Sequence, residues 1–212
     1  MICFECGPLA TNCYLVGDEA SRTAFLIDAP HGAFEPVMRV LSEKAWTLTD
    51  LLLTHTHWDH AADCARLRRE TGARVVVHEA DLYRLTDPMA HTKWPLPFVI
   101  DPVHDAVTIG KDVTSLTVSS GLLLDVLHTP GHTEGGICFI DKSNLRAFVG
   151  DMLFNGSVGR TDLPGGDMDM LVHSIRTQLF PLPDEMVAWP GHGPETTIGH
   201  ERRTNPFAAE SL

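Results

Sequence analysis

The stretch Thr54-His55-Thr56-His57-Trp58-Asp59-His60 is the most informative part of this chain. It follows the apolar residues 51–53 and places three imidazoles and a carboxylate within six positions. Alternate side chains of an extended segment face the same way, so His55 and His57 point to one side. Four ligand-type groups on one loop are too many for a single ion that keeps an open position. The spacing therefore predicts two adjacent metal ions that need further ligands from elsewhere.

Three other strand-like apolar runs are each followed by a further ligand-type residue. Residues 122–127 lead to His132, residues 147–149 lead to Asp151, and residues 186–189 lead to His192. A glycine directly precedes each of these three residues. Glycine lets the backbone turn tightly under a crowded site. The three residues are therefore candidate ligands for the two ions.

Together these motifs resemble those of the metallo-β-lactamase-fold hydrolases, and the resemblance covers nearly the whole chain. It implies an α/β fold, a four-layer αββα sandwich with two sheets face to face, helices outside and the metals at one edge of the sheets. We expect one such domain over residues 1–212. The resemblance assigns His55, His57 and His132 to one metal, Asp59, His60 and His192 to the other, and Asp151 to both.

The hydrophobic pattern is consistent with an α/β fold. It predicts helices over residues 35–45, 61–71, 168–179 and 197–203, with Gly72 ending the second of them. Strands are expected at 2–6, 13–17, 23–28, 46–53, 74–78 and 186–189, with more between 115 and 150. The elements form two similar halves that divide near Thr108. The proline-rich segment from Thr86 to Asp105, with Trp94 and Phe98, is either a lid over a site or a stiff surface crossing.

Composition and charge argue against several classes of protein and partner. The 212 residues include 16 basic and 28 acidic side chains, a formal charge of −12, which argues against nucleic acid as a partner. The N-terminus has no signal-peptide pattern, and no apolar run reaches membrane-spanning length, so we expect no membrane partner. Five cysteines, an odd number, fit a reducing cytoplasm better than a disulfide framework. Nothing in the sequence indicates an oligomeric state.

The remaining ligand-type residues are interpreted as structural. Cys3 and Cys6 form a lone Cys-x-x-Cys without the second pair that a zinc knuckle needs. Cys13, Cys64 and Cys138 lie in apolar or small-residue contexts that are typical of a core. The other histidines match no ligand position of the motifs and are expected not to bind metal: His31, His78, His91, His104, His128, His173 and His200.

Within the family, the sequence is most similar to the glyoxalase II branch. Two-zinc lactamases place a cysteine where this chain has Asp151, and an aspartate there can bridge both metals. The glyoxalase II patterns T-H-x-H-W-D-H-A and G-D-x-L-F match residues 54–61 and 150–154, and the cation that follows matches Arg160. Because the chain stops at Leu212, we expect a short member of the branch, without the C-terminal helical domain that helps hold glutathione.

The resemblance implies a metal-dependent hydrolase of a small acyl thioester, such as S-D-lactoylglutathione, that acts by attack of a metal-bridging hydroxide. Asp59 would orient this nucleophile and take its proton, while Asp151 bridges the metals. Arg160 is the expected substrate contact, since a guanidinium binds a carboxylate bidentately; the alternative is a salt bridge to Asp162 or Asp167. Zinc is the expected metal, and iron or manganese fits the same ligands.

Two other functions stay open. Mono-iron persulfide dioxygenases share the fold and the Gly159-Arg160-Thr161-Asp162 sequence, and they would use His55, His132 and Asp151. They typically carry A-H-D-Y where this chain has Gly191-His192-Gly193-Pro194. The complete second set of ligands therefore favours the hydrolase. The third possibility is a non-catalytic metal-binding module on the same fold.

Overall fold

The computed structural model describes residues 1–118 and 121–209. The chain divides into two compact units. Unit 1 comprises Met1–Gly110 and Thr117–Leu122, and unit 2 comprises Lys111–Leu116 and Leu123–Leu212. The main division after Gly110 lies close to Thr108, where the sequence predicts that the two halves meet.

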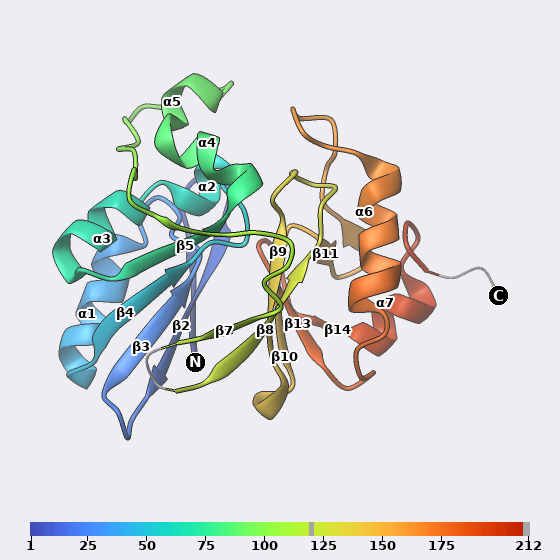
Figure 1. The fold of residues 1–212 in the computed structure, drawn as a ribbon, viewed down its shortest axis with the longest axis horizontal. Helices are drawn as coiled ribbons and strands as arrows, with labels where there is room; N and C mark the ends of the chain where they lie inside the picture. The colour runs from blue at the N-terminus through green and yellow to red at the C-terminus, as the bar shows by residue number, and fades with distance from the viewer. Residues whose placement is uncertain (119–120, 210–212) are drawn as a thin grey trace. The chain divides into compact units, whose positions relative to one another are not determined.

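Unit 1 contains a six-stranded sheet with the order β1-β2-β3-β4-β5-β6 (Figure 1). Its strands are β1 (Ile2–Cys6), β2 (Thr11–Asp18), β3 (Thr23–Ile27), β4 (Thr47–Leu52), β5 (Arg74–His78) and β6 (Val107–Ile109). Pairs from β1 to β3 are antiparallel, whereas pairs from β3 to β6 are parallel. Parallel strands end at the same edge of a sheet, so the loops after β3, β4 and β5 all begin at one edge.

The helices of unit 1 are α1 (Phe34–Lys44), α2 (Trp58–Ala61), α3 (Cys64–Thr71), α4 (Leu82–Thr86) and α5 (Pro88–His91), with the short 3-10 helix η1 (Glu79–Asp81). Helices α1 and α3 lie on the same side of the sheet (Figure 1), and α3 packs against β4 and β5. Gly72 ends α3 with φ +72°, as the sequence predicts. The helix expected over 61–71 is interrupted, because the Asp63 N–H bonds the Ala29 carbonyl at 2.9 Å. The segment 86–105 is not a plain loop, since it contains α5.

Unit 2 contains a second six-stranded sheet with the order β14-β13-β10-β9-β8-β7, and a separate hairpin. The strands are β7 (Ser115–Thr117), β8 (Leu123–His128), β9 (Ile137–Asp141), β10 (Arg146–Gly150), β13 (Val187–Pro190) and β14 (Thr196–Thr197); β11 (Leu153–Phe154) and β12 (Ser157–Val158) form the hairpin. Strands β8, β9 and β10 pair antiparallel, and β10 pairs with β13 in parallel. Both β10 and β13 therefore deliver the residues that follow them to one edge of this sheet.

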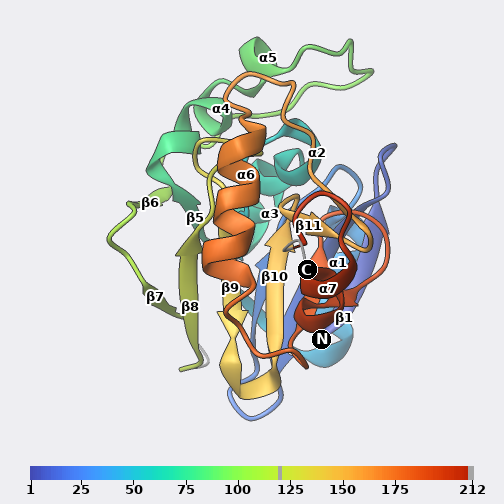
Figure 2. The same ribbon diagram turned by 90° about the vertical axis from the view of Figure 1, so that its right-hand side faces the viewer.

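The helices of unit 2 lie on one side of its sheet. They are α6 (Met168–Ser174) and α7 (Ile198–Thr204), and the short 3-10 helix η2 (Lys142–Asn144) follows β9. Figure 2 shows α6 in front of β9 and β10, and α7 packs against β14. The helix expected over 168–179 is continuous, but its second part, η3 (Ile175–Leu179), is π-helical. This helix turns Leu171, Ile175 and Leu179 into the core, as the helical spacing predicts.

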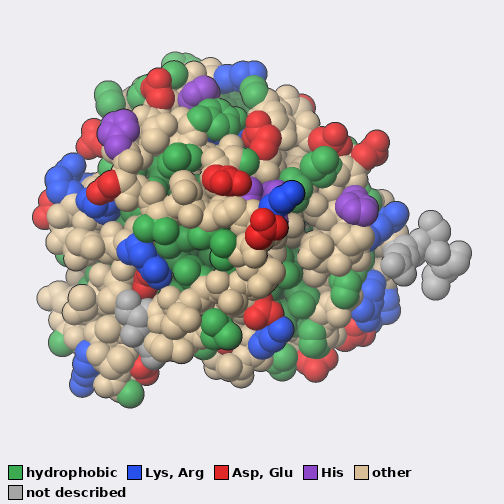
Figure 3. Space-filling model, viewed as in Figure 1, with side chains coloured by type: hydrophobic (Ala, Val, Ile, Leu, Met, Phe, Trp, Pro, Cys, Tyr) green, Lys and Arg blue, Asp and Glu red, His purple; other side chains and the backbone are tan. Residues whose placement is uncertain are grey.

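Each unit buries a hydrophobic core of its own. The core of unit 1 includes Leu15, Leu26, Val37, Leu51 and Val75. The core of unit 2 includes Ile140, Val149, Leu171, Ile175 and Ala188. Acidic and basic side chains are interspersed on the face shown in Figure 3. Among the described residues, no helix has the length and apolar character needed to span a membrane.

Candidate metal centre

Unit 1 brings together the four ligand-type residues of the loop after β4. His55, Asp59 and His60 are buried, and His57 is partly buried. The ring centroid of His55 lies 4.9 Å from that of His57 and 4.1 Å from that of His60. The Nε2 atom of His60 is 3.6 Å from Oδ2 of Asp59. The loop therefore forms a compact half-site of three imidazoles and one carboxylate.

Asp28, directly after β3, organises this half-site. Its carboxylate accepts hydrogen bonds from the backbone N–H and the hydroxyl of Thr54, both at 2.8 Å. The same carboxylate lies 2.8 Å from Nδ1 of His60. Asp28 is 2% exposed and has a φ of +58°, a backbone conformation that few residues other than glycine adopt. The sequence motifs do not predict a role for Asp28. Its position directly after β3, which pairs in parallel with β4, could have indicated that it lies at the same edge of the sheet as the ligand loop.

The contact between Asp28 and His60 determines which imidazole nitrogen can act as a ligand. A histidine that donates its Nδ1–H to a carboxylate presents Nε2 to a metal, and such partners commonly hold metal-binding histidines in place. The Nε2 atom of His60 is also the atom that faces Asp59. The Thr11 hydroxyl donates to Oδ2 of Asp59 at 3.4 Å and restrains that carboxylate. Both side chains are therefore oriented before any ion binds.

A second buried aspartate that the sequence did not identify supports the middle of the loop. The Thr56 N–H donates to Oδ2 of Asp81 at 3.2 Å, and the Thr56 hydroxyl donates to the Asp81 carbonyl at 2.8 Å. Asp81 also pairs with the buried Arg84 at 2.9 Å. These contacts hold the backbone between His55 and His57, and with it the positions of both rings.

Unit 2 brings together the other three predicted ligands. His132 follows β8, Asp151 follows β10 and His192 follows β13. Oδ2 of Asp151 lies 3.6 Å from Nε2 of His132 and 3.5 Å from Nε2 of His192. One carboxylate oxygen is therefore close to the same nitrogen of two different histidines.

Two glycines allow the backbone of unit 2 to close around these residues. A Cβ on Gly159 would lie 1.9 Å from the Asp151 carbonyl oxygen and 3.0 Å from Nδ1 of His132. Because Gly159 lacks a side chain, the next residue, Arg160, brings its carbonyl oxygen to 2.7 Å from Nδ1 of His132. Gly131 has a φ of +139°, and a Cβ there would lie 2.3 Å from the backbone of Leu171. Both positions require close approach of two backbone segments.

The distances within each half-site fit metal binding. Separations of 3.5–3.6 Å between a histidine nitrogen and a carboxylate oxygen exceed the usual N–H···O hydrogen-bond length of about 2.7–3.2 Å. Two atoms that are each about 2.1 Å from a tetrahedral ion lie about 3.4 Å apart. His60 and His132 also have their Nδ1 atoms engaged, which orients Nε2 as the ligand. Imidazole and carboxylate donors suit zinc, iron and manganese.

Arg160 is exposed and forms a bidentate pair with Asp162. Its Nε and Nη2 donate to the two carboxylate oxygens, each at 2.7 Å. Hydrogen bonding to the guanidinium lowers the pKa of the Asp162 carboxyl to about 2. The salt bridge that the sequence left open as an alternative is therefore present, and the guanidinium charge is balanced by a neighbour.

Several histidines expected not to bind metal have other contacts within their own unit. His31 stacks on Phe98, His78 accepts from the Ala80 N–H, His91 contacts Tyr83, His128 lies 3.0 Å from the Glu134 carbonyl and His200 lies near Thr204. These contacts are typical of structural histidines.

Comparison with known proteins links this geometry to a family. A family model described as Metallo-beta-lactamase superfamily matches residues 6–192. The Haemophilus influenzae protein named hydroxyacylglutathione hydrolase GloC is 38% identical over 198 residues, which cover 92% of each chain. The crystal structure of the BLEG-1 B3 metallo-β-lactamase has a TM-score of 0.90 at 33% identity and covers 99% of both chains.

A further solved structure, that of TTHA1623 in a di-iron-bound form, has a TM-score of 0.84 at 35% identity. It covers 98% of this chain and 100% of that protein. These matches confirm the α/β metallo-β-lactamase fold that the sequence predicts, and the similarity to GloC confirms the resemblance to the glyoxalase II branch.

Proposed function

Because the chain belongs to the metallo-β-lactamase superfamily, a superfamily of metallo-hydrolases, we propose that it is a binuclear thioesterase of the glyoxalase II kind. Its substrate is a small acyl thioester, S-D-lactoylglutathione or a close analogue. The similarity to a hydroxyacylglutathione hydrolase over 92% of both chains supports this substrate class. The formal charge of −12 argues against the nucleic-acid substrates of other branches.

The observation that carries the proposal is the position of Asp151. Its Oδ2 atom lies 3.5–3.6 Å from Nε2 of both His132 and His192, the two histidines that we assign to different metals. A carboxylate oxygen placed in this way suits a ligand shared by two ions.

We assign the ligands in three groups. His55, His57 and His132 would hold one ion; Asp59, His60 and His192 would hold the other; Asp151 would be shared by both. Zinc is the proposed metal. Iron and manganese accept the same imidazole and carboxylate donors, and the related TTHA1623 protein has been solved with two irons.

The residues of the chain prepare the site for attack on a thioester. Two divalent ions bound there would polarise the thioester carbonyl and lower the pKa of a bound water to about 7. Asp59, Asp151 and a bound hydroxide would balance three of the four positive charges, so the loaded site would keep a positive charge that favours a developing oxyanion. Asp59, restrained by the Thr11 hydroxyl, orients the nucleophile and accepts its proton. Arg160 is the proposed contact for a carboxylate of the substrate.

A paired measurement of metal content and substrate preference tests this function. The purified protein is analysed for zinc, iron and manganese, and kcat/KM is then measured for S-D-lactoylglutathione, a chromogenic cephalosporin and a phosphodiester. We expect about two metals per chain and the highest kcat/KM for the thioester. The cephalosporin is a necessary comparison because a structure at TM-score 0.90 is described as a B3 metallo-β-lactamase.

Three results would contradict the proposal. A higher kcat/KM for the cephalosporin would make the protein a lactamase. Oxygen uptake with glutathione persulfide and one iron per chain would make it a dioxygenase that uses His55, His132 and Asp151. Stoichiometric metal without turnover of any thioester would indicate a non-catalytic metal-binding module.

A further inference from the structure

Three aromatic rings form a row that joins the ligand loop of unit 1, residues 54–60, to Phe98 of the segment 92–99 and to His31. Trp58 lies within the ligand loop and is 8% exposed, and its ring centroid is 6.2 Å from that of Phe98. Phe98 in turn stacks on His31, with ring centroids 3.8 Å apart and planes within 6° of parallel. The row therefore holds the end of this segment close to the loop that carries the metal ligands.

The residues on either side of the segment are also anchored within unit 1. Helix α5 precedes it, and two ion pairs to α3 follow it: Arg68 with Asp105, and Arg69 with Asp101 at 3.4 Å. Pro95 and Pro97 restrict the backbone inside the segment. These contacts tie the residues that follow the segment to α3 of unit 1.

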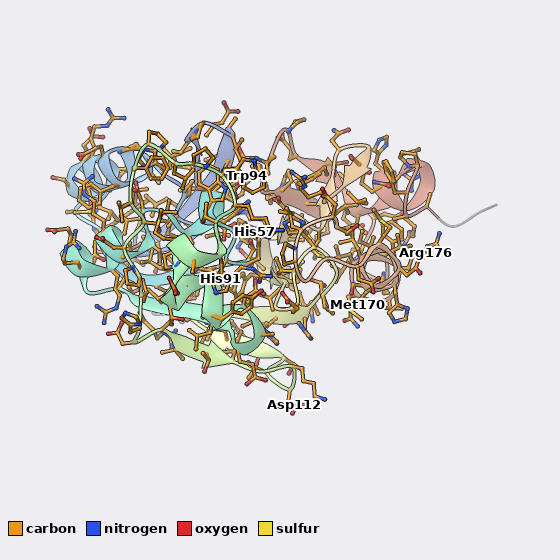
Figure 4. All side chains as sticks on the ribbon, turned by 90° about the horizontal axis from the view of Figure 1, so that it is seen from above. His57, His91, Trp94, Asp112, Met170 and Arg176 are labelled. Carbon is orange, nitrogen blue, oxygen red and sulfur yellow. The ribbon has the colours of Figure 1, made fainter. Side chains whose placement is uncertain are left out.

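Between these anchors the segment exposes an apolar surface and one cation. Trp94 is 44% exposed and Val99 is 76% exposed. Figure 4 labels Trp94 together with His57 of the ligand loop, seen from above. Lys93 is exposed and forms no ion pair with any residue of 1–118 or 121–209. In a chain with a formal charge of −12, an exposed cation that forms no such ion pair is suited to an anionic ligand.

The combination of indole, phenyl and ammonium groups fits a peptide thiol with a carboxylate. An extended tripeptide spans about 10 Å, at about 3.3–3.6 Å per residue. Lys93 is five residues from Phe98, so their Cα atoms are at most about 18 Å apart. This limit, together with the reach of a flexible lysine side chain, leaves room for a thiol carrier that extends from the metal ligands to Lys93. Arg160 does not fill this role by itself, because Asp162 balances its charge.

We propose that Lys93, Trp94 and Phe98 form a carrier-binding wall that selects thioesters of an anionic peptide thiol. The carboxylate of the carrier pairs with Lys93, and its apolar part lies against Trp94 and Phe98. This inference rests on the proposed thioesterase function for the identity of the ligand. It gives the substrate tail a binding surface within the metal-binding domain itself.

The wall is tested by charge reversal against a matched control. Lys93→Glu is compared with Lys111→Glu, which reverses an exposed lysine in unit 2. The substrates are S-D-lactoylglutathione and the neutral lactoyl thioester of N-acetylcysteamine. We expect Lys93→Glu to raise KM for the glutathione thioester about 3- to 10-fold, and less at 1 M salt, because exposed charges are screened. KM for the neutral thioester, and both KM values of Lys111→Glu, should stay within about twofold of the parent.

A binding measurement separates this inference from the proposed function. S-hexylglutathione is a thioether and cannot be hydrolysed, so calorimetry reports its Kd without turnover. We expect Lys93→Glu to raise that Kd by a similar factor, and Trp94→Ala to raise it without altering its salt dependence. If the parent hydrolyses neither thioester but Lys93→Glu selectively weakens S-hexylglutathione, the wall stands and the thioesterase proposal fails. The wall would be overturned if Lys93→Glu raised KM equally for the glutathione and the neutral thioester. It would also be overturned if Lys111→Glu had the same effect as Lys93→Glu, or if the parent protein did not bind S-hexylglutathione.

Discussion

The Nδ1 atom of His60 lies 2.8 Å from Oδ2 of Asp28, a residue 32 positions earlier in the chain. Both side chains are almost fully buried. The same carboxylate also holds the backbone and hydroxyl of Thr54, at the start of the ligand loop. Asp28 therefore links the exit of β3 to both ends of the loop and orients Nε2 of His60 toward Asp59.

The first prediction concerns this link. Asp28→Ala should lower the affinity for one of the two metals about 10- to 100-fold, because His60 loses the partner that orients it. Competition with a chromogenic chelator measures the affinity, and elemental analysis measures the metal per chain. Asp28→Asn is the accompanying variant if the alanine protein does not fold, since asparagine tolerates the left-handed backbone of residue 28.

The control for this experiment is Asp112→Ala, which removes an exposed carboxylate from unit 2. It should leave both metal affinities unchanged. Normal affinities in both Asp28 variants would show that Asp28 braces the loop without affecting the ligand nitrogen of His60.

The second prediction distinguishes the bridging ligand from a terminal one. Asp151→Ala should reduce the metal content at both positions and abolish thioester hydrolysis, because its carboxylate is proposed to serve both ions. His192→Ala should remove a ligand from one ion only and leave about one metal per chain. Elemental analysis of the two variants, after dialysis against metal-free buffer, is the measurement. Two metals per chain in Asp151→Ala would rule out the bridging assignment.

The third prediction concerns Gly159. A Cβ at this position would lie 1.9 Å from the Asp151 carbonyl oxygen, so Gly159→Ala must move one backbone segment away from the other. We expect the free energy of unfolding to fall by about 1–3 kcal/mol, as for other overpacked sites, and metal affinity to fall with it. Urea denaturation measures the first change and chelator competition the second.

Gly72→Ala provides the comparison for this variant. Gly72 ends α3 with φ +72°, and a Cβ added there would have no described neighbour within 4 Å, so its substitution costs backbone strain alone. It should lower stability without affecting metal affinity. If Gly159→Ala behaves like Gly72→Ala in both measurements, the close contact to Asp151 does not matter for the site.

Much of the fold could be predicted because hydrophobic periodicity and strand-end motifs are local signals. The runs before His132, Asp151 and His192 are strands, and Gly72 ends a helix in the left-handed conformation. The break between α2 and α3 was not predictable, since it depends on the bond from the Asp63 N–H to the carbonyl of residue 29, far away in the sequence. Helix propensity carries no information about such tertiary hydrogen bonds.

The supporting shell of the site was harder to predict than its ligand-type residues. His55 and its neighbours form a dense motif, whereas Asp28 follows a strand and Asp81 ends the short helix η1, with no pattern around either. Their importance comes from burial and from hydrogen bonds to Thr54, Thr56 and His60, which appear only when the strands are assembled. The pairing of Arg160 with Asp162 was one of two alternatives, because sequence spacing alone does not decide between a salt bridge and a substrate contact.

The fourth prediction concerns the five cysteines, which are all free thiols. Burial raises the pKa of Cys6 to about 11 and that of Cys64 and Cys138 to about 12, and raises the pKa of Cys13 well above its ordinary value. At pH 8 a thiol with a pKa of 11 is about one part in a thousand thiolate, the reactive form. A thiol reagent at pH 8 should therefore label the exposed Cys3 first in the native protein and all five cysteines in denaturant. Rapid labelling of a second native cysteine, detected by mass spectrometry, would contradict the buried positions.

The last prediction concerns the pair of Arg160 and Asp162. Because the pKa of Asp162 is lowered to about 2, its carboxylate stays ionised at every pH above about 3. The stabilisation from this pair is present above the ordinary carboxyl pKa and is lost only as the pH falls through about 2. From pH 5 to 9 the pair is therefore intact, and the titration of Asp162 should not alter KM.

Within that pH range, substitutions should reveal how the pair affects an anionic substrate. Arg160→Ala should raise KM for an anionic thioester about 3- to 10-fold and leave KM for a neutral one unchanged, because only the anion loses a charge-assisted contact and faces the remaining carboxylate. Asp162→Asn should lower KM for the anion, since it releases the guanidinium. In the double variant the two effects should not add, because the residues contact each other. If Arg160→Ala changes KM equally for charged and neutral thioesters, Arg160 serves only to hold its loop, through the pair that its guanidinium forms with Asp162.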